Sequence, residues 1–362
     1  MPAGFYSISV SKINRETADA VSITLDVPSN LANEFTYKAG QYLTFAIVIN
    51  GEEVRRSYSV CSSPVTNANP TIAVKQVENG RMSTYLNTEL KEGDVLDVMP
   101  PMGKFVLEPN SAASNNYFLF GGGSGITPLI SIIKTSLLLE SNSQCFLFYA
   151  NRDEESIIFK EELKALEDAN SNFKVFYSLD NPPADWGGFK GFVTEAQVSE
   201  LIRQELGLNY PTAQYYTCGP SVMMQIVENG LKATGVRGEN ISVEYFTAVV
   251  KSTEDTATSD GDNPEDFSDE RVERKVQVEV FGSQKEITVK PEETILIAAQ
   301  DAGLDPPYSC TVGVCTTCRA RLRTGRASMD EREGLSDTEI EMGYILTCQA
   351  HPLTDDVDLI FE

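Results

Sequence analysis

The chain has 362 residues, enough for two or three domains, and its 41% hydrophobic and 23% charged residues are typical of a globular protein. Its formal net charge of −24 disfavours nucleic acid or an anionic membrane surface as a partner. No apolar run approaches membrane-spanning length and the N-terminal MPAGFYSISV lacks a signal-peptide pattern, so we expect a cytoplasmic protein.

Residues 1–110 alternate apolar and polar side chains in short runs separated by turn residues. This pattern predicts an antiparallel sheet that closes into a small barrel. Two polar stretches stand out, Arg56-Ser57-Tyr58-Ser59 at a predicted strand end and Gly80-Arg81-Met82-Ser83-Thr84 after another strand. An arginine can neutralise phosphate, a tyrosine can stack on a flat ring, and hydroxyls at a helix start can donate to phosphate oxygens. By composition alone, an ordinary strand end and turn are the simpler interpretation.

After Asn116 the pattern changes to continuous apolar strands that alternate with amphipathic segments. This alternation predicts a parallel, doubly wound sheet over residues 111–250. Its first strand leads into a helix through FGGGSGITP, residues 120–128, where glycines allow a pyrophosphate to approach the backbone and the helix N-terminus supplies N–H donors. The match to G-x-G-x-x-G is incomplete, because Ile126 stands where the third glycine would fall, and tight packing is the alternative.

The second strand of this domain ends in Tyr149-Ala150-Asn151-Arg152. Where an acidic residue would favour NADH, a nearby arginine can pair with the 2′-phosphate of NADPH, so Arg152 gives a modest preference for NADPH. Three acidic residues follow directly, which weakens this preference, and a solvated loop residue is the alternative interpretation of Arg152.

Residues 251–273 carry nine acidic and two basic residues and almost no apolar ones, which predicts a flexible, solvated linker. It would separate a C-terminal domain, residues 274–362, from the rest of the chain. In that domain Arg319, Arg321 and Arg323 alternate along a predicted strand and would share one face. This face could steer a partner that carries an acidic patch, or it could simply be a solvated strand face.

Four cysteines of the C-terminal domain carry the strongest signal: Cys310, Cys315 and Cys318 read C-x4-C-x2-C, and Cys348 follows after 29 further residues. This is the plant-type spacing for a [2Fe–2S] cluster, in which four thiolates bind two irons. Zinc sites usually show two C-x2–4-C or C/H pairs instead, so zinc and plain thiols are the lesser alternatives.

The other cysteines and the one histidine add little chemistry. Cys61, Cys145 and Cys218 fit free thiols in a reducing cytoplasm. His351 is the only histidine, whereas a Rieske centre needs two, and we expect it to be a surface or loop residue.

The motifs R-S-Y-S, G-R-M-S-T, G-G-G-S-G-I-T-P and C-G-P, in this order, resemble the ferredoxin–NADP reductase superfamily over nearly the whole chain. The appended cysteine motif narrows the resemblance to reductases of multi-component oxygenases, among them those of bacterial phenylacetyl-CoA epoxidase. The resemblance implies a β-barrel for FAD, an α/β domain for NAD(P)H, and an α+β ferredoxin-like domain of the β-grasp type.

The resemblance also implies roles for matching residues. Arg56 would lie at the FAD phosphates, Tyr58 against the isoalloxazine and Ser59 near its reactive nitrogen, with Ser57 in the same segment. The FAD pyrophosphate would lie against Gly80, Met82, Ser83 and Thr84. The nicotinamide dinucleotide would lie against Gly123, Ser124, Gly125 and Thr127.

Cys218, with Gly219 and Pro220, would lie near the nicotinamide where hydride moves, which makes Ser59 and Cys218 the expected catalytic residues. A buried small residue in a strand is the alternative interpretation of Cys218. Phe246 matches an aromatic residue that contacts the flavin in relatives, and it could equally be a core phenylalanine.

We therefore expect an electron-transfer reductase with the order NAD(P)H → FAD → [2Fe–2S] → partner oxygenase, the favoured partner being the phenylacetyl-CoA epoxidase of phenylacetate degradation. One alternative keeps this order but changes the acceptor to a ring or steroid hydroxylase or a hybrid-cluster protein. A non-catalytic redox sensor is the second alternative, and it would need no hydride site.

Overall fold

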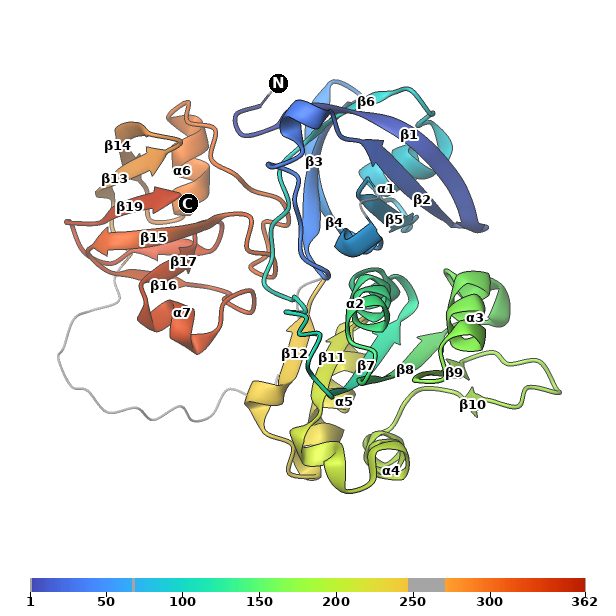
Figure 1. The fold of residues 1–362 in the computed structure, drawn as a ribbon. Coiled ribbons are helices and arrows are strands. Elements are labelled where there is room, and N and C mark those ends of the chain that lie inside the picture. The colour runs from blue at the N-terminus through green and yellow to red at the C-terminus, as the bar shows by residue number, and fades with distance from the viewer. Residues whose placement is uncertain (1, 67–68, 247–270, 362) are drawn as a thin grey trace. The chain divides into compact units, whose positions relative to one another are not determined.

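The structure is a computed structural model that describes residues 2–66, 69–246 and 271–361 (Figure 1). It divides into two compact units: one spans residues 5–246, and the other combines residues 2–4 with the C-terminal part of the chain. Most of the predicted linker, residues 251–270, lies outside the described residues, so the structure does not test it.

The first sheet of the larger unit is antiparallel and has the strand order β4-β3-β6-β1-β2-β5. A bridge between Val60, just after β4, and Ile72 of β5 links the two edge strands and closes the predicted barrel. Helix α1 contributes Met82 and Leu86 to the apolar interior. The elements are β1 (Tyr6–Thr17), β2 (Ala20–Asp26), η1 (Ser29–Leu31), β3 (Tyr42–Ile49), β4 (Glu52–Ser59), η2 (Pro64–Thr66), β5 (Thr71–Lys75), α1 (Arg81–Thr88) and β6 (Val95–Val98).

The second sheet of this unit is parallel throughout, in the order β10-β9-β8-β7-β11-β12, as predicted for a doubly wound fold. Its first half contains β7 (Asn116–Gly122), η3 (Gly123–Gly125), α2 (Ile126–Leu139), β8 (Gln144–Asn151), η4 (Glu154–Ser156), α3 (Lys160–Ala169) and β9 (Phe173–Leu179). Its second half contains β10 (Phe189–Lys190), α4 (Glu195–Leu206), η5 (Gly207–Thr212), β11 (Gln214–Cys218), α5 (Ser221–Ala233), η6 (Gly238–Asn240) and β12 (Ile241–Glu244).

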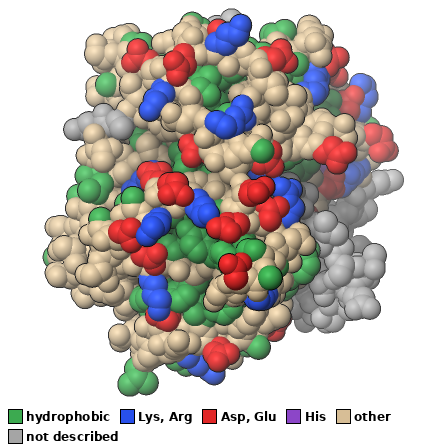
Figure 2. Space-filling view, turned by 90° about the vertical axis from the view of Figure 1, so that its right-hand side faces the viewer, with side chains coloured by type: hydrophobic (Ala, Val, Ile, Leu, Met, Phe, Trp, Pro, Cys, Tyr) green, Lys and Arg blue, Asp and Glu red, His purple; other side chains and the backbone are tan. Residues whose placement is uncertain are grey.

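Helices cover both faces of the parallel sheet, α2 and α3 on one and α4 and α5 on the other (Figure 1). The central strand β7 is therefore almost continuously buried, which explains its unbroken apolar sequence. Seen from the side of β9 and β10, acidic and basic side chains interleave around apolar ones (Figure 2). On the edge strands, aromatic side chains that include Tyr177 and Trp186 line a recess of about 450 Å³.

The smaller unit holds a mixed five-stranded sheet in the order β14-β13-β19-β15-β17 and a two-stranded sheet of β16 and β18. Strands β13 and β19 are parallel, and helix α6 adds Ile295, Ala298 and Ala299 to the core beside them. The elements are β13 (Arg274–Val280), β14 (Ser283–Val289), α6 (Ile295–Asp301), β15 (Arg319–Thr324), β16 (Ala327–Met329), α7 (Asp337–Glu341), β17 (Tyr344–Leu346), β18 (Ala350–Pro352) and β19 (Asp358–Phe361).

The two sheets of the larger unit and the mixed sheet of the smaller one confirm the predicted fold class. In the part of the chain that the structure describes, no helix combines the length and the apolar character needed to cross a membrane.

Candidate functional site

The glycine-rich turn after β7 packs directly against the Cys218 segment. A Cβ on Gly125 would lie 2.0 Å from the carbonyl oxygen of Cys218, so only glycine fits there. Tyr149 Oη donates to the Gly123 carbonyl at 2.9 Å, and Thr127 Oγ1 donates to the Ser124 carbonyl at 3.1 Å. The predicted dinucleotide residues therefore lie together with Cys218, at the carboxyl edge of the sheet where α/β proteins bind ligands.

Cys218 is fully buried between two neighbouring strands, in register with Gly121 of β7 and Glu244 of β12. Burial, reinforced by Glu244, raises the pKa of the Cys218 thiol well above its usual value. Burial also raises the pKa of Glu244 to about 8. Both groups are thus mainly neutral at pH 7, so the thiol at this edge is not a thiolate nucleophile.

The Arg56–Ser59 segment forms the end of β4. Arg56 is exposed and donates to the Arg55 carbonyl at 2.7 Å, whereas Arg55 is buried and pairs with Glu53 at 2.8 Å. Tyr58 is half-buried with its ring 5.9 Å from that of Phe45, and burial raises its pKa above the ordinary range. Of the two adjacent arginines, only Arg56 is accessible to a phosphate, as the sequence motif predicts.

The remaining residues of this segment are polar and sheltered. Ser59 is 3% exposed, and the Ser57 and Thr44 hydroxyls lie 2.8 Å apart. A sheltered hydroxyl can serve as a hydrogen-bonding group at the edge of a bound ring system. Ser59 therefore fits the position near the flavin that its motif implies.

Gly80 precedes α1, and no side chain caps this helix. The first turn also lacks acidic residues, so its N–H groups are left for an anion. Ser83 is buried and serves the turn itself, because its hydroxyl accepts from Val77 N at 3.2 Å and donates to the Gly80 carbonyl at 3.3 Å. Thr84 Oγ1 accepts from Gln76 Nε2 at 3.3 Å. Here a pyrophosphate would meet backbone N–H groups more readily than these hydroxyls.

Arg152, the predicted ligand of a 2′-phosphate, lies just after β8. Its Nε donates to Asp153 Oδ2 at 2.9 Å, and its side chain is 59% exposed. The hydrogen bond from Arg152 lowers the pKa of Asp153, so the pair is ionised at neutral pH. Arg152 therefore already has an anionic partner, the first of the three acidic residues that follow it in the sequence.

Phe246 is 39% exposed and lies just after β12, so it is not the buried core phenylalanine of the alternative interpretation. It is the last described residue of the larger unit. This exposure leaves its ring accessible to a ligand.

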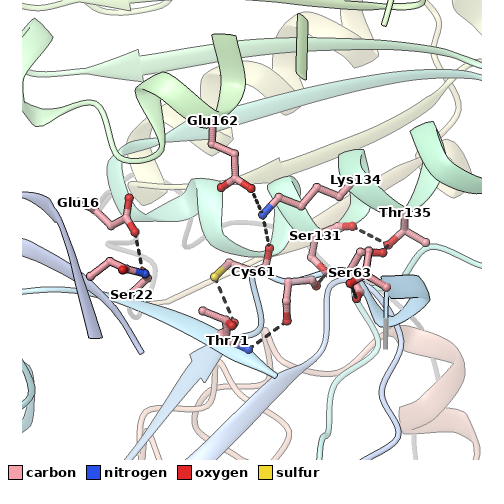
Figure 3. Close-up of polar contacts among 12 residues, drawn as sticks. Glu16, Ser22, Cys61, Ser63, Thr71, Ser131, Lys134, Thr135 and Glu162 are labelled. Atoms are coloured by element: carbon pink, nitrogen blue, oxygen red, sulfur yellow. Dashed lines mark hydrogen bonds and ion pairs between the residues drawn. The ribbon is translucent and has the colours of Figure 1, made fainter. Parts of the chain in front are cut away.

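The barrel meets α2 through polar contacts (Figure 3). Ser131 Oγ donates to the Ser62 carbonyl at 2.6 Å, and Lys134 Nζ donates to the Cys61 carbonyl at 3.2 Å. Lys134 also pairs with Glu162 of α3 at 2.7 Å. These contacts explain the polar residues on an otherwise apolar helix, and they fix the barrel against the dinucleotide-binding sheet.

The strongest interactions among the four cysteines of the smaller unit join Cys310 to Cys315 and Cys318 to Cys348, and weaker ones join Cys315 to Cys318 and Cys310 to Cys348. Among the described residues, no three Cys, His, Asp or Glu side chains converge as ligands of a single ion. Two thiols for each of two irons is the arrangement that a [2Fe–2S] cluster requires, whereas one zinc ion would draw four ligands to one point. The donor set therefore fits the cluster.

Backbone hydrogen bonds build this arrangement. Cys315 N and Val312 N donate to Cys310 Sγ at 3.4 and 3.5 Å, and the Cys315 thiol together with these N–H groups lowers the pKa of Cys310 to about 5. Thr347 holds the Cys318 carbonyl through both its N–H (3.2 Å) and its hydroxyl (2.9 Å), which brings Cys348 beside Cys318. N–H groups directed at a cysteine sulfur stabilise the thiolate that a metal needs.

One expectation about a charged side chain needs correction. His351 is not a surface or loop residue: it is 3% exposed in β18, and its Nε2 lies 3.0 Å from Asp330 Oδ2. The β15 arginines are largely neutralised within their own unit. Arg319 pairs with Glu339 at 3.0 Å, and Arg323 pairs with Glu279 and Asp358.

Comparison with known proteins agrees with this arrangement. Residues 7–107 match the oxidoreductase FAD-binding domain, residues 119–229 the oxidoreductase NAD-binding domain, and residues 278–353 the 2Fe-2S iron-sulfur cluster binding domain. The chain is 36% identical to a component of 1,2-phenylacetyl-CoA epoxidase from Escherichia coli (strain K12), over 99% of this chain and 98% of that protein. The chain belongs to the ferredoxin–NADP reductase superfamily, in the branch with a C-terminal [2Fe–2S] domain.

Other members of the superfamily are similar over the same length. The ferredoxin reductase component of 3-ketosteroid-9-alpha-monooxygenase from Rhodococcus rhodochrous is 34% identical, over 100% of this chain and 99% of that protein. The solved structure of phthalate dioxygenase reductase shares the fold, with a TM-score of 0.58 and 24% identity over 99% of this chain and 98% of that chain. The protein is thus an NAD(P)H-dependent flavin and iron–sulfur oxidoreductase.

Two polar residues of this reductase were missed at the sequence level. Glu244 occurs in the apolar run ISVEYF, and an acidic residue alone in such a run was the one sign in the sequence that it could be buried. Asn151 is the last residue of β8. Neither belongs to a recognisable spacing: Asn151 is distinguished by its burial at the end of β8, and Glu244, at the end of β12, by its position beside Cys218 of β11.

Proposed function

We propose that this reductase delivers electrons from NAD(P)H to the oxygenase component of a phenylacetyl-CoA epoxidase. The observation that carries the proposal is the similarity to the E. coli epoxidase component over 99% of the chain, with all three cofactor domains in one order. A reductase for a steroid monooxygenase is the second candidate, because the Rhodococcus component is nearly as similar. A redox sensor is disfavoured, since it would need no hydride site.

For FAD, we propose that Arg56, Ser57, Tyr58 and Ser59 of β4 bind the flavin side. The turn around α1 would bind the pyrophosphate through Gly80, Met82, Ser83 and Thr84. Phe246 would contact the flavin ring. The exposure of Arg56, the shelter of Ser59 and the uncapped start of α1 support these roles.

For the dinucleotide, the proposed contacts are Gly123, Ser124, Gly125, Thr127 and Arg152, with Cys218, Gly219 and Pro220 at the nicotinamide. The close packing of Gly125 against Cys218 supports one continuous site. Cys310, Cys315, Cys318 and Cys348 would bind the cluster.

When bound, FAD accepts electrons as a pair and releases them singly, which suits a one-electron cluster. The neutral Cys218 thiol and the mainly protonated Glu244 would provide an uncharged surface for the nicotinamide, with Ser59 across from it on the barrel. The contacts of Lys134 and Ser131 with the barrel loop would hold the two surfaces at a fixed separation and limit the entry of water.

We further propose the domain limits 1–110 for FAD, 111–250 for NAD(P)H and 274–362 for the cluster, joined by the acidic linker 251–273. The matched ranges and the three sheets support these limits. A cytoplasmic location is part of the same proposal, because the four unpaired cluster thiols and the free Cys61, Cys145 and Cys218 favour a reducing compartment.

Reconstitution tests the acceptor. The purified holoprotein should contain one FAD, two irons and two sulfides, and with NAD(P)H it should support epoxidation by the oxygenase component of phenylacetyl-CoA epoxidase. Turnover of a steroid monooxygenase component instead would assign the second candidate. Inactivity with both components, despite rapid ferricyanide reduction, would refute the proposed acceptors and retain the reductase.

Cys315→Ser tests whether the cluster of the smaller unit and flavin reduction in the larger unit are independent. Cluster iron and delivery to the oxygenase should be lost, whereas reduction of FAD by NAD(P)H should continue at the unaltered rate. Loss of flavin reduction in this variant would show that the cluster unit is needed for the first step, contrary to the proposal.

A further inference from the structure

Asn151 is a buried polar residue that none of the described contacts explains. It ends β8 and is 6% exposed, and neither its amide nitrogen nor its amide oxygen has a hydrogen-bond partner among the described residues. Its backbone is fixed, because its carbonyl accepts from Asp180 N at 3.0 Å. Buried amides are nearly always paired, so an unpaired one at a ligand-binding edge indicates a ligand.

The surroundings of Asn151 belong to the dinucleotide site. Alternation along β8 places its side chain on the same face as Tyr149, whose hydroxyl donates to Gly123 in the glycine-rich turn. Burial raises the pKa of Tyr149, and a contact of its hydroxyl with the Asn151 amide partly offsets this increase, but that contact lacks the geometry of a hydrogen bond. In dinucleotide-binding folds, the end of the second strand is where the adenosine ribose is contacted, and β8 is the second strand of this sheet.

The surface directly beyond this strand end is acidic. A cavity of about 750 Å³ opens there between the barrel and the parallel sheet. Its lining includes six acidic and two basic side chains, which are Glu16, Asp153, Glu154, Glu155, Glu161 and Glu162 against Arg15 and Lys160. Three of the acids are paired, Asp153 with Arg152, Glu154 with Lys160 and Glu162 with Lys134, and the other three leave the lining net acidic. A 2′-phosphate carries nearly two negative charges at pH 7 and would be repelled by this lining.

The nearby arginine does not compensate for this charge. Arg152 Nε donates to Asp153 Oδ2, and Asp153 is itself held by Ser156 N, which donates to Oδ1 at 2.9 Å. Asp153 is therefore locked as the N-cap of η4 and orients the guanidinium. Because Asp153 occupies the Nε group of Arg152, a 2′-phosphate could bind only the two terminal nitrogens and would lie close to the ionised Asp153 carboxylate.

We propose that the Asn151 amide hydrogen-bonds the adenosine ribose hydroxyls of the dinucleotide, and that the site selects NADH over NADPH. A neutral amide offers a donor and an acceptor to hydroxyl groups but cannot neutralise a phosphate. The inference rests on the proposed dinucleotide site, and it reverses the preference for NADPH that Arg152 suggested from the sequence.

The first experiment compares NADH with NADPH on the wild-type holoprotein, with ferricyanide as acceptor. We expect kcat/KM to be at least tenfold higher for NADH. Equilibrium binding of the non-reducing NAD⁺ and NADP⁺, measured by calorimetry, should show the same order. Equal values or a preference for NADPH would overturn the inference but leave the reductase intact, whereas no flavin reduction by either coenzyme would overturn the proposed function itself.

Two substitutions at Asn151 locate the contact. Asn151→Ala should weaken NAD⁺ binding and lower kcat/KM for NADH by tenfold or more, mainly through KM. Asn151→Asp retains acceptor oxygens for the ribose, so it should recover most NADH use while NADPH use falls further. Equal losses in both variants, with a lower unfolding temperature, would assign Asn151 a structural role and refute the contact.

A substitution that removes a charge tests whether Asp153 is the reason that the site selects NADH over NADPH. Asp153→Ser should release Arg152 and raise kcat/KM for NADPH at least fivefold, and adding Arg152→Ala should abolish this gain. Asp168→Ser is a matched control, because it also removes a carboxylate from an ion pair, with Lys164 at 2.8 Å on exposed α3. A similar increase in kcat/KM for NADPH in the control, or no increase in Asp153→Ser, would show that the Arg152–Asp153 pair does not determine the choice of coenzyme.

Discussion

The dinucleotide site of the larger unit is formed mainly by main chain, whereas the cluster site of the smaller unit is formed by side chains. Gly125 lies against the Cys218 carbonyl and Tyr149 binds the Gly123 carbonyl, so backbone contacts shape the first site. Four thiols in two pairs define the second. The dinucleotide site should therefore be sensitive to substitutions that add side-chain atoms, and the cluster site to substitutions that remove a thiol.

The largest effect should come from Gly125→Ala, because its methyl group would lie 2.0 Å from a backbone oxygen that cannot rotate away. We expect loss of about 3 kcal/mol of stability and at least a hundredfold loss of flavin reduction by NAD(P)H. Thermal unfolding and stopped-flow absorbance measure the two effects.

Gly238→Ala is the matched control, because an added Cβ there meets no atom within 4 Å. It should change neither measurement, and both variants should retain their iron. Near-normal hydride transfer in Gly125→Ala would show that the glycine-rich turn can move, and the contrast between the two sites would fail.

This contrast also explains how far the sequence could be interpreted. The cysteine spacing predicted the cluster ligands because each ligand must be one residue type. Strand periodicity predicted the two sheets of the larger unit, whereas the fold of the smaller unit was implied only by the family resemblance. The glycine-rich turn gave only an incomplete motif, since its geometry depends on Cys218, which is distant in sequence. Asn151 and Glu244 carried no spacing signal, because what distinguishes them is burial created by the folded sheet.

The burial of His351 and the surroundings of the β15 arginines likewise depend on long-range packing. His351 was expected at the surface, but Asp330 provides a partner that allows it to be buried. The arginines of β15 do alternate, yet their acidic partners come from β13, α7 and β19. Alternation along a strand predicts which face of the sheet a side chain occupies, but it does not predict which distant residues that side chain contacts.

An intermediate effect is expected for Glu244→Gln, which removes the titratable group beside Cys218. Because burial raises the pKa of Glu244 from 4.5 to about 8, its stabilising contribution is complete below pH 4.5 and is lost as the pH rises through 8. The full shift would correspond to about 4 kcal/mol between pH 5 and pH 9, and because Glu244 is only partly buried we expect the wild type to lose about half of this, roughly 2 kcal/mol, relative to the variant.

Urea unfolding of both proteins across this range measures the difference. Glu200→Gln, on the exposed surface of α4, should follow the wild type. Parallel pH profiles for wild type and Glu244→Gln would show that Glu244 is solvated, and would remove the case for an uncharged nicotinamide surface.

A smaller effect tests the backbone of the cluster loop. Thr311 has φ +58°, a left-handed conformation that is unfavourable for a β-branched residue and better tolerated by asparagine. Thr311→Asn should therefore stabilise the smaller unit by roughly 0.5–1 kcal/mol and slow the loss of iron to a chelator. The same change at Thr288, an exposed residue of β14 outside the left-handed region, should be neutral or slightly destabilising. Faster iron loss in Thr311→Asn would mean that the threonine side chain itself supports the loop.

The smallest effect is expected for Arg321→Glu, which tests whether side chains of β15 steer the partner. Arg319 and Arg323 are paired with acids of their own unit, so the predicted positive face carries little net charge. Electron delivery to the oxygenase component should fall by no more than about threefold at low salt, and ferricyanide reduction should not change. A tenfold or larger decrease that disappears at high salt would show that this face does steer the partner despite its internal ion pairs. In that case the smaller unit would use side chains both to hold the cluster and to guide docking.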